Sequence, residues 1–80
     1  MTYHSKNGQE FIGLRSTSNG SHQVVYDNLM GARVLVDVKD PSANLRAIDE
    51  ALREGITSRN VLSGVLKALK IRNISFEYQA

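Results

Sequence analysis

The hydrophobic pattern of this chain changes from period two to helical spacing at Asp40-Pro41-Ser42, and that change limits the possible folds more than any other feature. Before it, Arg33–Val38 alternates with period two, which places the three valines of this segment on one face of a strand. After it, apolar residues recur at helical spacing, at Leu45, Ile48 and Leu52. A strand-like first half followed by a helical second half predicts an α+β fold.

Asn-Gly pairs divide the first half of the chain into strands. Asn19-Gly20 separates the strand-like runs Gln9–Thr17 and His22–Leu29, and this dipeptide favours a two-residue hairpin turn because both of its residues tolerate positive φ. Asn7-Gly8 leaves room for a short strand before Gln9, and Gly31 marks the turn that precedes Arg33. We therefore predict three or four antiparallel strands.

Two helices follow. Asp40 is a suitable N-cap and Pro41 a suitable first helical residue, while Gly55 in the left-handed conformation would end this helix. The second helix is expected to begin at Thr57 or Ser58 and to run to about Lys70. Its apolar stripe consists of Val61, Leu62, Val65, Leu66 and Leu69.

The segment Ile74–Tyr78 alternates as a final strand. Residues 1–80 therefore predict one α+β domain, a two-layer arrangement of an antiparallel sheet with two helices on one face. The order is β-β-β-α-α-β, with room for one extra N-terminal strand. No linker or internal repeat divides the 80 residues.

Composition argues against several classes of function. The chain has no cysteine, so disulfides and thiolate metal sites are excluded, and no apolar run approaches the ~20 residues that span a bilayer. His4 and His22 lack metal-ligand spacing, and Asp37, Asp49 and Glu50 are placed as ordinary surface charges. We expect a cytoplasmic protein that is not an enzyme and has no membrane partner, metal or cofactor.

Residues 51–61 resemble a helix-turn-helix motif. Ala51, Gly55, Ile56 and Val61 occupy the places of the motif's small residue, turn glycine and two packing aliphatics, although Gly64 stands where a third aliphatic is usual. The resemblance implies that the second helix would read the major groove of DNA. The residues that would contact DNA are Arg59, Asn60, Ser63, Lys67 and Lys70.

The predicted hairpin leads to a different hypothesis. A two-residue turn at Asn19-Gly20 would pair Leu14 with Val25 and Gly13 with Tyr26. One face would then carry Ile12, Leu14 and Val25, and the other face would carry Phe11, Val24 and Tyr26. Because the helices can cover only one face, we regard Phe11, Val24 and Tyr26 as candidate interface residues.

These patterns favour a small binding or regulatory module that acts through protein–protein contacts. We expect the chain to associate with its own copy, most simply as a dimer. It is short and has no disulfides, its sheet has apolar residues on both faces, and its strand edges are unpaired. The alternative is a DNA-binding regulator that uses the second helix. Binding of a small molecule is neither supported nor excluded by the sequence.

Overall fold

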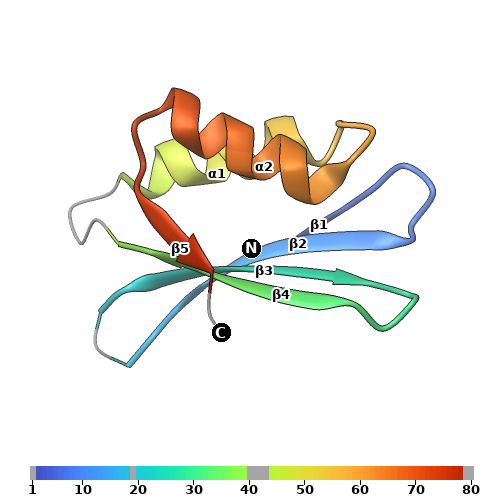
Figure 1. The fold of residues 1–80 in the computed structure, drawn as a ribbon, viewed down its shortest axis with the longest axis horizontal. Helices are drawn as coiled ribbons and strands as arrows, with labels where there is room; N and C mark the ends of the chain where they lie inside the picture. Colours follow the sequence, from blue (N-terminus) through green and yellow to red (C-terminus); the bar gives the residue numbers. More distant parts are fainter. Residues whose placement is uncertain (1, 19, 40–43, 79–80) are drawn as a thin grey trace.

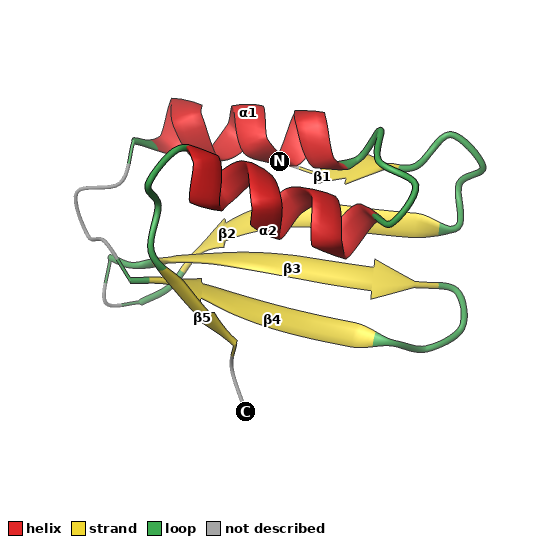
Figure 2. Ribbon diagram, turned by 45° about the horizontal axis from the view of Figure 1, so that its top comes forward, coloured by secondary structure: helices red, strands yellow, loops and turns green. Residues whose placement is uncertain are grey.

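The computed structural model describes residues 2–18, 20–39 and 44–78. Five strands form one antiparallel sheet whose spatial order follows the chain, and both helices lie on the same face of it (Figures 1 and 2). The elements are β1 (Thr2–His4), β2 (Glu10–Ser16), β3 (His22–Asn28), β4 (Arg33–Val38), α1 (Leu45–Gly55), α2 (Val61–Ile71) and β5 (Phe76–Tyr78). The predicted α+β fold is confirmed, with the extra N-terminal strand as β1 and the returning strand as β5.

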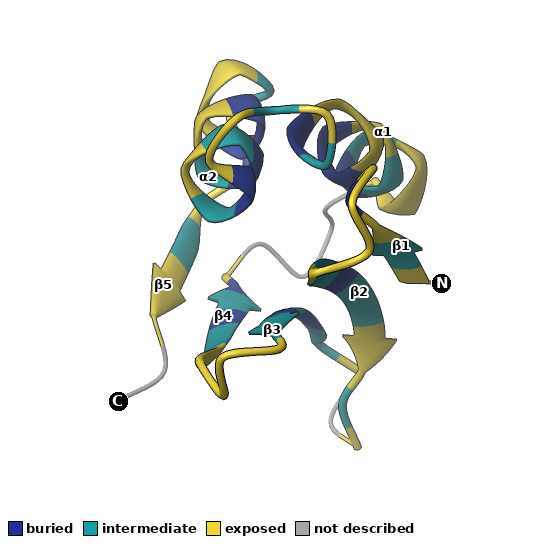
Figure 3. Ribbon diagram, turned by 90° about the vertical axis from the view of Figure 1, so that its right-hand side faces the viewer, coloured by how far each residue is buried: buried dark blue, intermediate teal, exposed yellow. Residues whose placement is uncertain are grey.

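The core lies between the sheet and the two helices. Leu14, Val24 and Val36 stand beside one another on neighbouring strands, and Ile12, Tyr26 and Val34 form the next row on the same face. The inner sides of the helices close over these rows, as the buried parts of α1 and α2 show in Figure 3. The fully buried helix residues are Ile48, Ala51, Leu52, Val65 and Leu69. The valines of β4 therefore share one face, as predicted.

The register between β2 and β3 differs from the prediction by one residue. The Thr17 N–H donates to the Ser21 carbonyl at 2.9 Å, and the Gly20 N–H donates to the Thr17 carbonyl at 3.1 Å. Gly20 has φ +84°, which suits the left-handed last position of a three-residue hairpin connection. The predicted two-residue turn was wrong, so Leu14 pairs with Val24 and not with Val25. Asn19 itself lies outside the described residues.

The shift in register reverses the two faces of β3. Because successive side chains of a strand point to opposite faces, a slip of one residue moves each of them to the other side of the sheet. Val24 and Tyr26 therefore lie beneath the helices, 0% and 8% exposed, and Val25 lies on the side away from them. The predicted grouping of Val24 and Tyr26 with Phe11 is corrected accordingly.

Both helices begin later than predicted. Asn44 caps α1, its side-chain oxygen accepting from the Arg46 N–H at 2.8 Å, and the helix begins at Leu45. Asp40 and Pro41 lie outside the described residues. Asn60 caps α2 by accepting from the Ser63 N–H at 3.0 Å, and Ile56–Asn60 form the connection instead of the first helical turn. In each case an asparagine beside the helix is the cap, as its short amide side chain permits.

Gly55 does not take the left-handed conformation that we predicted. It is the last residue of α1, and the glycines with positive φ among the described residues are Gly8, Gly20 and Gly31. Gly55 is needed because α2 passes close to it: a Cβ there would lie 2.6 Å from the Val65 nitrogen and 2.7 Å from its Cα. Gly55 is therefore required for the close approach of the helices and is not a left-handed C-terminal cap.

Candidate interaction surfaces

The sheet has one face that no described element covers, because α1 and α2 both lie on the other side (Figure 1). The register places three large apolar side chains on this open face. Val25 on β3 stands directly beside Leu35 on β4, and Phe11 on β2 is the diagonal neighbour of Val25. All three are half-buried by their neighbours within the sheet. They form a continuous apolar strip across the three central strands.

A hydrogen-bonded polar row borders this strip on one side. The Arg15 Nε–H donates to Gln23 Oε1 at 2.7 Å, and Gln23 Nε2 donates to Asp37 Oδ1 at 2.8 Å. Gln23 is only 3% exposed, so it links the two charged residues from a nearly buried position. These bonds hold Arg15 and Asp37 in place on the open face, which reduces the side-chain entropy that a partner would have to remove on binding.

The other border of the strip carries charge and a ring contact. Asp27 on β3 pairs across the strands with Arg33 on β4, and Arg33 is exposed. On β1, the His4 ring meets the edge of the Phe11 ring with their centroids 6.4 Å apart and the planes at 89°. The open face is thus apolar in its middle row and polar at both ends of its strands.

Of the three predicted interface residues, only Phe11 lies on the open face. Tyr26 is part of the core, where its hydroxyl donates to Glu10 Oε2 at 2.6 Å, and Val24 is fully buried. Sequence reasoning missed Val25 and Leu35. The missing information was the length of the turn around Gly20, since a three-residue turn would have placed Val25 on the same face as Phe11, with Leu35 beside Val25 on β4.

The predicted DNA-contact residues follow the outer side of α2. Ser63, Lys67 and Lys70 are exposed there, and Arg59 and Asn60 are exposed in the preceding connection. Spacings of four and three residues align Ser63, Lys67 and Lys70 along the helix. The Asn60 side-chain oxygen caps the helix by accepting from the Ser63 N–H. This is the same oxygen that would accept a hydrogen bond from a DNA base. Lys70 Nζ lies 6.0 Å from the centre of the Phe76 ring.

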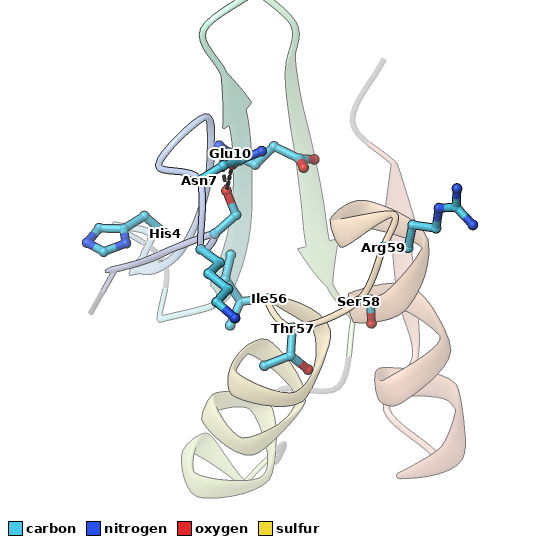
Figure 4. A pocket seen from close by; sticks show the side chains of 9 residues that line it. His4, Asn7, Glu10, Ile56, Thr57, Ser58 and Arg59 are labelled. Carbon is cyan, nitrogen blue, oxygen red and sulfur yellow. Dashed lines mark hydrogen bonds between the residues drawn. The ribbon is translucent and has the colours of Figure 1, made fainter.

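A cleft of about 830 Å³ opens between the β1–β2 turn and the α1–α2 connection (Figure 4). Its polar groups bond to one another: Ser5 Oγ donates to Asn7 Oδ1 at 2.7 Å and accepts from the Glu10 N–H at 3.1 Å. The Thr57 hydroxyl donates to the Glu54 carbonyl at 2.7 Å. His4 and Arg59 point away from each other at opposite sides of the cleft in Figure 4. His4 and Arg59 therefore do not converge on one point of the cleft.

Comparison with known proteins gives no further guide to these surfaces. No family model, curated protein or solved structure matches the chain. Within residues 2–18, 20–39 and 44–78, no helix is long and apolar enough to cross a bilayer, and no three histidine or acidic side chains gather as metal ligands would. The function must therefore be inferred from the surfaces themselves.

Proposed function

We propose that the protein is a non-enzymatic binding module that contacts another protein chain through the open face of its sheet. The observation that carries this proposal is the strip of Phe11, Val25 and Leu35, which the helices leave uncovered. Specific protein interfaces combine such an apolar centre with a polar rim. Arg15 and Asp37 on one side and Arg33 on the other supply that rim, and the bond network through Gln23 orients it.

The same residues explain why a flat contact is favoured over a ligand pocket. The apolar side chains come from adjacent strands and lie level with one another, whereas small molecules usually bind in concave sites with a few convergent polar groups. In the core, two tyrosine–carboxylate pairs join structural elements: Tyr3 donates to Asp49, and Tyr26 donates to Glu10. These pairs support the fold and are not assigned a catalytic role in this proposal.

Site-specific photo-crosslinking tests the proposal. A photoreactive phenylalanine analogue at Leu35, in cells that produce the chain, should give a covalent adduct with a protein. The matched control places the same analogue at Lys67 on the opposite, helical side. Mass spectrometry identifies the crosslinked chain, and the purified pair should then lose binding when Leu35 is replaced by Asp. Equal adducts from both positions, or none from Leu35, would contradict the proposal.

A second candidate function has its own observation. The twenty-two residues from Gly55 to Phe76 contain four basic residues and no acidic one, and of these only Arg72 has an ion pair with a described residue, Glu54 at 2.8 Å. Lys67 and Lys70 on the solvent side of α2, with the exposed Arg59 in the connection before it, thus form a basic surface. Such a surface suits contacts with the phosphates of a nucleic acid.

Fluorescence anisotropy with a labelled DNA duplex tests this second function. Replacement of both Lys67 and Lys70 by Ala should weaken binding at low salt and flatten its dependence on salt concentration, because fewer counterions are released. Arg46→Ala on α1 removes a cation from outside this basic surface and is the control. If the wild-type chain shows no binding at micromolar concentration in low salt, the DNA hypothesis is wrong.

A further inference from the structure

The open face has a symmetry that can be worked out from the strand register. Gly13, Val25 and Leu35 form a middle row across β2, β3 and β4. Phe11, Asp27 and Arg33 form a parallel row on one side of it, and Arg15, Gln23 and Asp37 form the row on the other side. Each outer row is two residues along the strands from the middle row, or ~7 Å away. The two outer rows are thus equidistant from the middle row.

We infer that the protein partner of the open face is a second copy of this chain, related to the first by a two-fold axis along the middle row. The inference rests on the proposed function, whose surface it uses. This rotation lays the middle row on its own copy, so Val25 and Leu35 pack on their counterparts. It also places each outer row opposite the other outer row of the second copy. Sheets that stack face to face in this way keep their strands within roughly 30° of one another.

The charges of the open face fit this axis. Arg33 comes to lie opposite Asp37 of the second copy, and Phe11 opposite Arg15 of the second copy, so each contact occurs twice. Arg33 has no ion pair with a described residue of its own chain, and the Phe11 ring can accept the Arg15 cation over its face. Asp27 comes to lie opposite Gln23, which is neutral. Opposite charges thus meet, and like charges do not.

The other simple face-to-face arrangement is less favourable. A two-fold axis along β3 would place Asp27 opposite Asp27 of the second copy. Two carboxylates in direct opposition at a contact that excludes water repel each other strongly. It would also place Leu35 opposite Gly13, which leaves the largest aliphatic side chain of the strip without an apolar partner.

The size of the open face sets the expected strength of association. Five strands of 3, 7, 7, 6 and 3 residues, ~4.8 Å apart and with a rise of ~3.4 Å per residue, cover roughly 400 Å² per copy. Two such faces would bury about 800 Å², which is below the ~1,200 Å² of stable specific interfaces, so we expect a weak dimer with a dissociation constant of about 100 μM to 1 mM.

Sedimentation velocity and light scattering across this concentration range test the inference. The wild-type mass should rise from 8.9 kDa toward twice that value. Arg33→Asp and Asp37→Arg, each alone, should raise the dissociation constant at least about tenfold, because each opposes like charges across the axis. The double variant restores opposite charges and should return to within about threefold of wild type. Arg46→Asp makes the same change of charge on α1, outside the interface, and should leave the mass unchanged.

The possible results separate the inference from the proposed function. A dimer in which the single charge changes have no effect would overturn the two-fold arrangement. A mass of 8.9 kDa throughout would overturn the second copy as partner. The proposed function would survive either result if photoreactive Leu35 still crosslinks to a different protein. It would fail separately if Leu35 gives no adduct of any mass. Circular dichroism establishes that each variant is folded.

Discussion

Gly55 and Gly64 are residues whose missing side chains let the two helices pack closely. A Cβ on Gly55 would meet the backbone of Val65 at 2.6 Å, and a Cβ on Gly64 would lie 2.5 Å from the Ser58 Cβ and 3.2 Å from the Gly55 carbonyl oxygen. Each glycine thus faces the segment that carries the other. In both cases an added methyl group would strike atoms that cannot simply rotate away. Gly64, the residue that departs from the helix-turn-helix pattern, therefore has a packing reason of its own.

Gly55→Ala should accordingly destabilise the protein. Alanine favours a helix by about 1 kcal/mol over glycine, but overpacking at a tight contact costs about 1–3 kcal/mol and here involves backbone atoms. We expect a net loss of about 1–2 kcal/mol in the free energy of unfolding, measured by urea denaturation. Ser63→Ala, at an exposed position of α2, is the control and should be close to neutral. A Gly55→Ala variant as stable as wild type would show that the helices can move apart at no cost.

At the scale of elements, the caps decide where the helices begin. Asn60 was a candidate for contact with DNA, but its side chain accepts from the Ser63 N–H and so belongs to the start of α2. Asn60→Ala should therefore cost about 1 kcal/mol in stability, and Asn60→Asp should retain most of it because a carboxylate also caps. Thermal melts of the three proteins measure this difference. A variant with unchanged stability would mean that Asn60 is free for another role.

The type and order of the elements could be predicted, whereas their ends and register could not. The alternation in Arg33–Val38 and the helical spacing after Leu45 reflect burial on one side, which is strong enough to be visible in sequence. The positions of the ends depend on smaller differences in free energy. Several residues around position 40 can cap a helix, and an Asn-Gly turn can have two or three residues, each at similar local free energy. Tertiary packing selects among them.

The prediction of the candidate interface depended on the length of the turn around Gly20. The prediction that one sheet face stays uncovered followed from the number of helices alone. The identity of its residues required the register, and an error of one residue replaced Val25 by Val24 and Tyr26. Phe11 does lie on the uncovered face, opposite Ile12 and Leu14, and its role in an interface stays a prediction. The possible contacts of surface charges such as Arg33 and Asp37 can be inferred only when the register shows which row of the sheet each residue occupies.

At the scale of the whole molecule, two tyrosine–carboxylate bonds tie the fold together. Tyr3 on β1 donates to Asp49 on α1 at 2.5 Å and so joins the sheet edge to the helical layer. Tyr26 on β3 donates to Glu10 on β2 at 2.6 Å. In each case the hydrogen bond to the carboxylate, with desolvation next, raises the pKa of the tyrosine above its usual value. Folding thus favours the protonated form of both phenols.

This shift predicts a loss of stability in alkali. A tyrosine in the unfolded chain ionises with a pKa of about 10, whereas Tyr3 and Tyr26 in the folded protein keep their protons to higher pH. The folded state then binds more protons than the unfolded state, so stability falls as the pH rises. The contribution of each pair is fully present below about pH 10 and is lost as the pH rises through the folded pKa.

Urea unfolding of wild type and Tyr26→Phe between about pH 7 and 11 measures this effect at Tyr26. The variant lacks the bond and should be less stable at pH 7. Because phenylalanine does not ionise, its stability should fall less steeply above about pH 10, so the two curves should converge there. Glu10→Gln keeps a hydrogen-bond acceptor for the Tyr26 hydroxyl but removes the negative charge that helps to retain its proton. The stability of this variant should therefore also fall less steeply with pH than that of the wild type. Curves that remain parallel across the whole range would show that the Glu10 carboxylate does not hold the Tyr26 proton in the folded protein.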